Sequence, residues 1–338
     1  MTGRSHRARS AAPLTRPLRV GVVVLTTGER PTELAAALDS VRRQRDVDPR
    51  IVVVHNVEIP DAPGVLEGDG LAADVDLPDE AAEPDDPEPD DLDLGLGAAE
   101  GTDVTVLRPG SNLGIPEGRN LGVDALDDVE VVLFLDDDGV LVGGDVLARA
   151  TAAFAADPTL GAISMRIVDP DTGRTERRHV PRLRVGDPSR SSWVTTFLGG
   201  ASLVRRVAYQ QAGGLPGRFF YAHEETSLAW RLLDAGYRIR YAGDLQLAHP
   251  AVAPARHAAY HHLTGRNRVL LARQHLPAPL AVVYVLLWAV IGAVRSPGGR
   301  RALLAGFIDG LRVREVDRTP IRWRTAWRML RYGRPPLL

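Results

Sequence analysis

The chain has 338 residues, enough for one large domain or two smaller ones with a substantial core. Its formal net charge of −2 argues against nucleic acid as a partner. The sequence contains no cysteine, which excludes disulfides, zinc–thiolate sites and thiol nucleophiles. It also contains no lysine, which excludes a Walker A phosphate loop, a Schiff-base enzyme and a kinase-type catalytic lysine.

The charges are unevenly distributed along the chain. Residues 1–17 are basic and lack an apolar run, so we expect a disordered N-terminus that is not a secretory signal. Residues 57–103 are acidic, rich in proline and free of arginine, and we interpret them as a disordered insertion in a surface connection. Residues 295–338 contain eleven arginines against three acidic residues, which gives this end of the chain a strong positive charge.

The first half of the chain alternates between predicted strands and predicted helices. Strands are expected at 18–26, 50–56, 104–107, 129–135 and 160–168. Helices are expected at 33–44, within 112–126 and at 145–156. A strand, helix and strand in succession imply a right-handed parallel crossover, so the pattern predicts an α/β fold whose mostly parallel central sheet is flanked by helices.

The second half is less regular. A helix is predicted at 224–235 and a strand at 237–241. The segment 276–294 carries no charge and is long enough, as a helix, to span a bilayer. Arginines stand on both flanks of this segment, which favours an in-plane or re-entrant segment over a simple crossing. A buried core helix is the alternative.

Three consecutive aspartates, Asp136, Asp137 and Asp138, follow the buried strand at 129–135. The carboxyl ends of strands are where open α/β sheets bind their ligands. Because Asp136 and Asp138 leave an extended strand on the same side, they can share a divalent cation and the oxygens of a phosphate. A solvated acidic turn that ends the strand is the alternative.

Four other segments carry polar groups suited to chemistry. The loop 26–30 follows the first strand and suits a nucleotide base or ribose. In the segment 112–122, Arg119 can reach a phosphate and Asn120 can bond a base or ribose, although a capped helix start also explains its proline and glycines. Glu224 and Glu225 at a helix start suit either a general base or simple capping. His249 follows a predicted strand, and without the other segments we would interpret it as a structural histidine.

These pieces occur in one order, and in that order the chain resembles the family 2 inverting glycosyltransferases, which have the GT-A fold. The motifs are Asn-x-Gly-x4-Arg-Asn-x-Gly at 112–122, Leu-Asp-Asp-Asp at 135–138, Gly-Gly-Ala-Ser at 199–202, and Glu-Glu followed by Arg231. The resemblance runs from about residue 18 to 277 and is closest to the rhamnosyltransferase-like, bacterial cell-envelope branch, which Arg266-Asn267 also fits. It implies a glycosyltransferase domain at 18–250. From their composition, residues 251–338 are expected to form a helical, Arg-rich, membrane-associated region.

The resemblance also implies roles for individual residues. The nucleotide would be bound by Thr26, Glu29, His55, Asn56, Arg119, Asp136 and Asp137. The metal ligands would be Asp138, Asp136 and His249. Glu225 would be the catalytic base with Glu224 beside it, and the acceptor or sugar pocket would contain Gly199, Gly200, Ala201 and Arg231.

The sequence departs from the family pattern at three positions. His55 stands where the second strand usually ends with an aspartate that reads the base, so the base is left open. Glu225 replaces the commoner aspartate as the base and is one methylene longer. Ser227 stands where a further acidic residue often follows, so the contacts to the acceptor are left open.

The implied activity is that of an inverting, hexosyltransferase-type enzyme. It would move a sugar from a UDP- or dTDP-linked donor to a hydroxyl of a lipid-linked or cell-envelope glycan, with Mg²⁺ or Mn²⁺. Arginines with Trp323 and Trp327 suggest contact with an anionic membrane, at the cytoplasmic face, as a peripheral or monotopic protein or with one embedded helix. A sugar-nucleotide pyrophosphorylase is disfavoured because such enzymes place a lysine against the phosphates. A catalytically degenerate scaffold that binds nucleotide or a membrane partner is the other alternative, motivated by His55 and Ser227.

Overall fold

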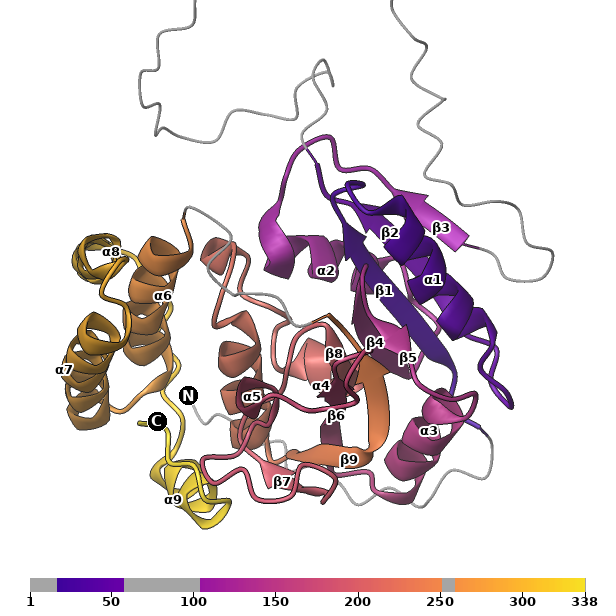
Figure 1. The fold of residues 1–338 in the computed structure, drawn as a ribbon. Helices are drawn as coiled ribbons and strands as arrows, with labels where there is room; N and C mark the ends of the chain where they lie inside the picture. Colours follow the sequence, from indigo (N-terminus) through magenta and orange to yellow (C-terminus); the bar gives the residue numbers. More distant parts are fainter. Residues whose placement is uncertain (1–16, 58–103, 251–258, 338) are drawn as a thin grey trace, which may run out of the picture.

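A computed structural model describes residues 17–57, 104–250 and 259–337 of the chain. Within these residues the strands join into one sheet, flanked by helices (Figure 1). The strands are β1 (Val20–Thr26), β2 (Arg50–His55), β3 (Val104–Leu107), β4 (Val131–Asp136), β5 (Val140–Leu141), β6 (Leu160–Val168), β7 (Ser192–Val194), β8 (Ala201–Arg205) and β9 (Arg238–Ala248). The predicted α/β architecture, with a central sheet flanked by helices, is confirmed. The sheet is mixed, with four parallel and four antiparallel strand pairings.

The helices cover both faces of the sheet and then form a separate C-terminal group (Figure 1). They are α1 (Pro31–Arg42), α2 (Gly114–Asp124), α3 (Val146–Ala156), α4 (Arg206–Gln211), α5 (Glu224–Ala235), α6 (Tyr260–His275), α7 (Ala278–Arg295), α8 (Arg300–Arg312) and α9 (Trp323–Arg331), with short 3-10 turns η1 (Arg177–His179) and η2 (Gly217–Phe219). The expected disorder of the N-terminus and of the acidic insertion concerns residues that lie almost entirely outside the described ranges.

The strand order brings the ends of β1 and β4 together. The sheet runs β3-β2-β1-β4-β8-β6-β9-β5, with β7 beside β9. β1 pairs in parallel with both β2 and β4, and the register places Thr26 opposite His55 and Leu25 opposite Asp136. β8 then joins β4 in the antiparallel sense, with Ala201 opposite Leu135. The first strand's loop, the aspartates and the Gly-Gly step therefore meet at one edge of the sheet.

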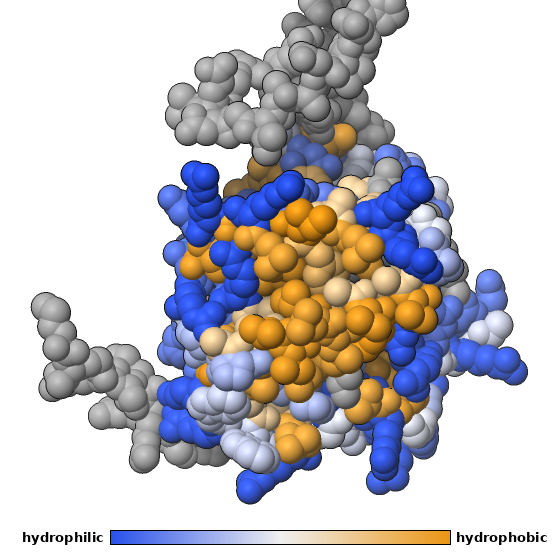
Figure 2. Space-filling model, turned by 90° about the vertical axis from the view of Figure 1, so that its left-hand side faces the viewer, coloured by the Kyte–Doolittle hydropathy of each residue, from blue (hydrophilic) through white to orange (hydrophobic). Residues whose placement is uncertain are grey.

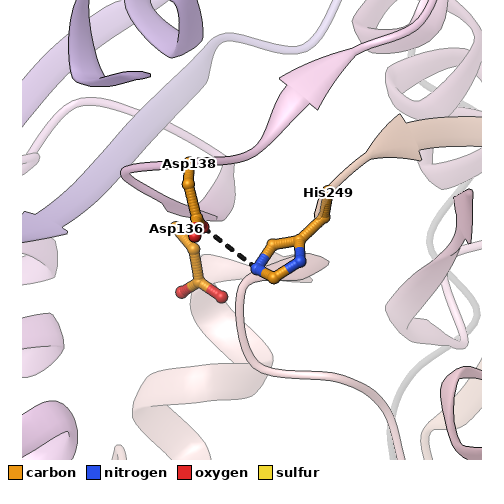
Figure 3. A group of neighbouring side chains, drawn as sticks. All are labelled: Asp136, Asp138 and His249. Atoms are coloured by element: carbon orange, nitrogen blue, oxygen red, sulfur yellow. Dashed lines mark ion pairs between the residues drawn. The ribbon is translucent and has the colours of Figure 1, made fainter. Parts of the chain in front are cut away.

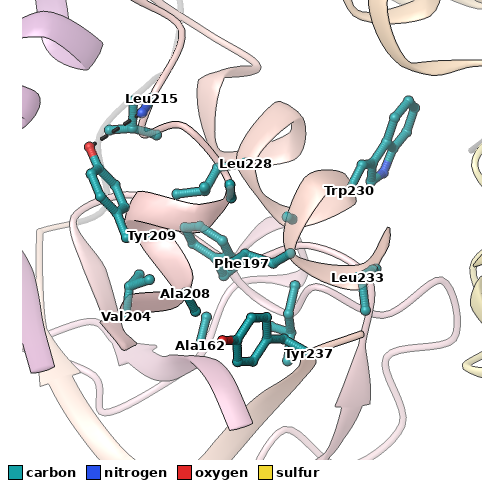
Figure 4. Packing of buried hydrophobic residues seen from close by; sticks show 14 of the residues in the cluster. Ala162, Phe197, Val204, Ala208, Tyr209, Leu215, Leu228, Trp230, Leu233 and Tyr237 are labelled. Carbon is teal, nitrogen blue, oxygen red and sulfur yellow. Dashed lines mark hydrogen bonds between the residues drawn. The ribbon is translucent and has the colours of Figure 1, made fainter. Parts of the chain in front are cut away.

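Two apolar layers hold the helices on the sheet. Successive side chains of a strand point to opposite faces. On β1, Val22 and Val24 accordingly pack with the helices α1 and α3, whereas Val23 packs with α2, α4 and α5. Figure 4 shows part of the layer that contains Val23, where Phe197 and Tyr209 lie near Leu228 of α5. This packing fixes the start of α5 relative to the sheet edge.

Strand β9 is longer than the sequence predicted. The expected strand ended at Tyr241, but β9 continues to Ala248. Its pairing with β6 shifts register between Met165 and Arg166, close to Gly243. The irregularity breaks the alternating pattern that sequence reading relies on. The extra residues carry His249 to the sheet edge that holds the aspartates.

The C-terminal helices pack closely on one another and leave α7 exposed. Gly306 and Gly310 of α8 face the backbone of α6, where an added Cβ would collide with the carbonyl of His262 or crowd that of Arg266. α7 is the helix of the described residues that is long and apolar enough to cross a membrane, and only 11% of its apolar window is buried. The alternative of a buried core helix is therefore not supported.

Candidate functional site: an acidic cluster with bridging arginines

The loop after β1 holds the middle aspartate of the triplet. The Thr26 hydroxyl donates to Asp137 at 2.7 Å, and it accepts the N–H of Gly28 at 3.0 Å. Gly28 has a φ of +79°, which favours glycine, and a Cβ there would crowd His55. Burial raises the pKa of Asp137, while Thr26 and Arg30 oppose the shift. The Asp137 carboxylate is thus tied to the loop and is less accessible than its neighbours.

Asp136, Asp138 and His249 converge at the end of β4 and β9 (Figure 3). His249 Nε2 lies 3.0 Å from one carboxylate oxygen of Asp138. The other ring nitrogen, Nδ1, lies 2.7 Å from the carbonyl of Pro250, which orients the imidazole. One potential ligand atom from each of the three residues falls within 4.8 Å of the others. Two neighbouring aspartates and a histidine more than a hundred positions later thus form one site.

Charge pairing shapes the ionisation of this cluster. Burial alone raises the pKa of Asp138, but the hydrogen bond and charge of His249, with help from Arg30, lower it below its usual value. Burial likewise lowers the pKa of His249, but the Asp138 contact raises it above its usual value. The pair is therefore stabilised as carboxylate and imidazolium when no cation competes with the proton.

The donor set of this cluster fits a divalent cation. Two carboxylates and an imidazole provide oxygen and nitrogen ligands, and carboxylate oxygens suit Mg²⁺ and Mn²⁺. The imidazole must be neutral to bind a metal, so a bound cation would displace a proton from His249. The three residues predicted as metal ligands are those that the structure brings together.

Arg30 was missed as a site residue by sequence reasoning. Its guanidinium pairs with Asp138 and lies 3.2 Å from a carboxylate oxygen of Asp137. The side chain is partly exposed at the mouth of the β1 loop. A basic residue in the loop after the first strand was the only signal in the sequence. Its position gives the cluster a positive charge beside the aspartates.

Arg119 connects the metal-type cluster to the glutamate pair. The side chain is almost fully buried, and its two terminal nitrogens reach Asp136 at 2.9 Å and Glu225 at 3.4 Å. The guanidinium also lies over the ring of Phe134, 5.6 Å from its centroid. Burial opposes the charged form, but Asp136 and the glutamates outweigh it and raise the pKa of Arg119. Arg119 is therefore a fixed positive charge between two carboxylates.

The Gly-Gly step lets these carboxylates approach the backbone. A Cβ on Gly199 would collide with Glu225 and with the guanidinium of Arg119. A Cβ on Gly200 would collide with the carboxylate of Asp136. Ala201, the next residue, is buried at the start of β8 and belongs to the core. The acidic site therefore requires glycine at both positions, because any side chain there would displace its charged groups.

The two glutamates at the start of α5 have different environments. Glu224 is buried, and burial, then the charge of Glu225, raises its pKa well above the usual range. Burial therefore favours the protonated form of Glu224. Glu225 is partly exposed and faces Arg119. A general base must be reachable by its substrate, and its partial exposure distinguishes Glu225 from the buried Glu224.

The segment before the glutamates is held in an unusual backbone conformation. Phe220, Ala222 and His223 all have positive φ angles, between 62° and 71°. Such angles are uncommon for residues other than glycine and cost free energy unless the surroundings hold them. The buried amide of Asn267 donates to the carbonyls of residues 219, 221 and 222, at 2.7 to 3.0 Å. Asn267 of α6 thereby fixes the approach to Glu225.

Several predicted site residues serve the protein's own structure. The Asn56 amide bonds the loop before α2, accepting from the N–H of Leu113 and donating to the Gly114 carbonyl. The Asn120 amide both donates to and accepts from the backbone of Leu215, at 3.0 Å each. Arg231 donates to the carbonyls of residues 212, 214 and 227.

The other residues singled out in the sequence lie in the β1 loop, behind that loop or in the core. Glu29 is exposed in the β1 loop. His55 is buried beside Gly28, and burial lowers its pKa. Ser227 is fully buried, and its hydroxyl lies 2.8 Å from the Nε2 of His275. A carboxylate at position 227 would therefore be buried in the core, which gives a physical reason for the serine.

No family model matches this chain, and no curated protein matches its sequence. Solved structures do match its fold. The chain aligns with GalNAc-T7 in a structure with UDP, GalNAc and Mn²⁺, at 14% identity and a TM-score of 0.57, covering 81% of this chain and 50% of that one. It thus spans about half the length of GalNAc-T7.

Two further structures match over most of both chains. One is the mannosyltransferase PcManGT from Pyrobaculum calidifontis in complex with GDP-Man and Mn²⁺, at 18% identity and a TM-score of 0.51, covering 90% of this chain and 78% of that one. The other is S. aureus TarS 1-349 in complex with UDP-GlcNAc, at 12% identity and a TM-score of 0.54, covering 92% and 83%. The chain has a GT-A-like glycosyltransferase fold.

Proposed function

We propose that the protein is a metal-dependent inverting glycosyltransferase of family 2 that uses a nucleotide-diphosphate sugar. The observation that carries the proposal is the arrangement around Arg119. One guanidinium contacts both Asp136 of the candidate metal cluster and Glu225, the accessible glutamate of the pair. A site for a diphosphate and a candidate base therefore lie on opposite sides of one side chain.

The chemistry needs one displacement and no protein nucleophile. Glu225 accepts the proton of an acceptor hydroxyl as that oxygen forms its bond to the anomeric carbon. The bond from the anomeric carbon to the diphosphate oxygen breaks on the opposite side, so the configuration inverts and the nucleoside diphosphate leaves. Asp136, Asp138 and His249 would hold the cation, which when bound neutralises charge on the leaving group.

We propose a UDP- or dTDP-linked sugar as the donor, the class that the family resemblance implies. Thr26, Glu29 and Gly28 belong to the loop at the end of β1, where a nucleotide binds in open α/β sheets. The neutral His55 behind this loop replaces an acidic reader of the base. A degenerate scaffold remains the second candidate, and it would bind nucleotide without transferring sugar.

We further propose that the acceptor lies at a membrane and that the enzyme acts on the cytoplasmic face of that membrane. Figure 2 shows a broad hydrophobic surface on the side that carries the C-terminal helices. We call this surface the apolar face, and its exposed residues are Val282, Val283, Leu286, Val290 and Val294 of α7 and Leu304, Ile308 and Leu311 of α8. Exposed arginines 295, 300, 301 and 312 stand in the same two helices or the turn between them. Apolar side chains bordered by arginine suit the interface of an anionic bilayer.

Replacing the base should separate binding from transfer. Glu225→Gln should lower the release of nucleoside diphosphate from the active donor by about 10²- to 10⁴-fold while the Mn²⁺-dependent binding of nucleotide persists. Asp138→Asn should reduce both. Turnover is measured on a panel of UDP- and dTDP-sugars with a membrane extract as acceptor, and folding by circular dichroism. Wild-type turnover in both folded variants would show that the roles are misassigned.

A methyl group on Gly200 should disrupt the metal cluster without a change in charge. In Gly200→Ala the new Cβ would collide with Asp136, so Mn²⁺-dependent nucleotide affinity should fall by about tenfold or more. Gly298→Ala is the matched control, because nothing lies within 4 Å of its added Cβ. Isothermal titration of Mn²⁺ and nucleotide checks both variants. Equal affinity in the two would contradict the assigned position of Asp136.

A charge in the apolar face should release the protein from vesicles. Val290 is 64% exposed in α7, and Val290→Glu should lower co-sedimentation with phosphatidylglycerol vesicles by about tenfold. Val207→Glu, at a valine of α4 that is 49% exposed, is the matched control and should bind as the wild type does. Equal loss in both variants, or no binding by the wild type, would refute the membrane face.

A further inference from the structure

A cavity separate from the acidic cluster lies between the start of α5 and the C-terminal helices. Its walls come from the β7 loop, α5, α6, α7, α9 and the C-terminal segment. The lining residues are Thr195, Thr196, His223, Thr226, Trp230, Arg268, Tyr284, Trp288, Met329, Arg334 and Pro335. None of the residues assigned above to the metal, the nucleotide or the base lines this cavity.

The described lining is positive and rich in hydrogen-bond donors. It contains two arginines and three threonines, and none of these described residues carries a carboxylate. His223 Nε2 is buried and meets no hydrogen-bond partner among the described residues. Burial, with the charges of Arg268 and Arg334, lowers the pKa of His223 well below its usual value. A neutral imidazole can donate one hydrogen bond, so the cavity suits an anion with several oxygen acceptors.

Aromatic packing orients the guanidinium of Arg268. Its central carbon lies 3.5 Å from the centre of the Trp288 ring, and one terminal nitrogen donates to the Tyr284 hydroxyl at 3.0 Å. A stacked guanidinium keeps further N–H groups in its plane for a ligand. Arginine forks match the geometry of phosphate oxygens, so a held arginine favours phosphate among anions.

The same helix joins the cavity to the apolar face. Tyr284 and Trp288 are one turn apart on α7 and line the cavity, whereas Leu286 and Val290, also one turn apart, are exposed on the apolar face. Thr226 is the residue after Glu225, so the first turn of α5 also borders the cavity. A ligand with a phosphate head and an apolar chain would meet suitable surfaces on both sides of α7.

We propose that this cavity binds the phosphate or diphosphate group of a lipid-linked acceptor. The proposal rests on the proposed function, because it identifies the acceptor class of the same enzyme. Arg268 and Arg334 would neutralise the phosphate, the threonine hydroxyls and His223 would donate to its oxygens, and the lipid chain would follow α7 to the apolar face. The acceptor would thereby be anchored beside the helix start that carries Glu225.

Binding of farnesyl phosphate to the full chain tests the proposal without any sugar transfer. Farnesyl phosphate should bind, measured by isothermal titration below its micellar concentration, whereas farnesol should not. Inorganic phosphate should compete only weakly, because it lacks the chain. Equal affinity for inorganic and farnesyl phosphate would assign the cavity to free phosphate and overturn the lipid part.

Matched variants locate the binding. Arg268→Gln should weaken farnesyl phosphate about tenfold or more, and Thr226→Val, which keeps the side-chain shape, should weaken it less. Arg43→Gln removes an exposed arginine from the end of α1, outside the apolar face, and should have no effect. Equal loss in Arg268→Gln and Arg43→Gln would point to surface charge and overturn the site. If Arg268→Gln does not fold, unchanged binding by folded Thr226→Val would overturn it.

A separate measurement distinguishes this proposal from the proposed function. Arg268→Gln should retain the Mn²⁺-dependent binding of nucleotide, since Arg268 does not contact the acidic cluster. A wild type that binds farnesyl phosphate but never turns over a donor would overturn the glycosyltransferase function and keep the anion site. A wild type that turns over a donor but does not bind farnesyl phosphate would overturn the cavity proposal alone.

Discussion

The buried guanidinium of Arg119 is the interaction on which the site depends. Five carboxyl groups, those of Asp136, Asp137, Asp138, Glu224 and Glu225, gather at one edge of the sheet. Like charges at such short range repel, and burial strengthens the repulsion because the local dielectric is low. Arg119 forms ion pairs with two of these groups, Asp136 and Glu225, from within the core. When one partner of a buried ion pair is removed, the charge of the other is left uncompensated.

The other charges of the site are balanced in different ways. Arg30 and His249 neutralise Asp138, and Thr26 donates to Asp137. The remaining group, Glu224, is buried where the protonated form is favoured. The arrangement separates two functions: Asp136, Asp138 and Glu225 can face a cation or a substrate, while the buried Arg119 holds Asp136 and Glu225 in place. The segment with positive φ angles before α5 also helps to position the site, because Asn267 binds its carbonyls and so fixes where the helix with the two glutamates begins.

The sequence was most informative where chemistry and periodicity agreed. The apolar runs predicted β3, β6 and α5 within their observed bounds because buried strands and amphipathic helices have distinct periods. The apolar run before the aspartate triplet likewise predicted a buried strand, and the triplet lies at the end of that strand, β4. The roles proposed for the individual site residues stay predictions, although the structure brings Asp136, Asp138 and His249 together.

Other features depended on contacts that no local pattern encodes. The full length of β9 follows from an irregularity in its pairing with β6, and the pairing of Arg30 with the aspartates joins residues more than a hundred positions apart. Asn56 and Asn120 looked like ligand-binding amides, but the backbone of neighbouring loops uses their hydrogen bonds. An amide serves either purpose equally well, so residue type alone could not distinguish them.

The most direct test of the central claim is the thermal stability of the protein with UDP, dTDP and GDP, each with and without Mn²⁺. If Asp136, Asp138 and His249 hold a cation against a diphosphate, at least one of these nucleotides should raise the melting temperature only when Mn²⁺ is present. The nucleotide that does so would also identify the donor class. No stabilisation by any of the three, or the same stabilisation without Mn²⁺, would contradict the account.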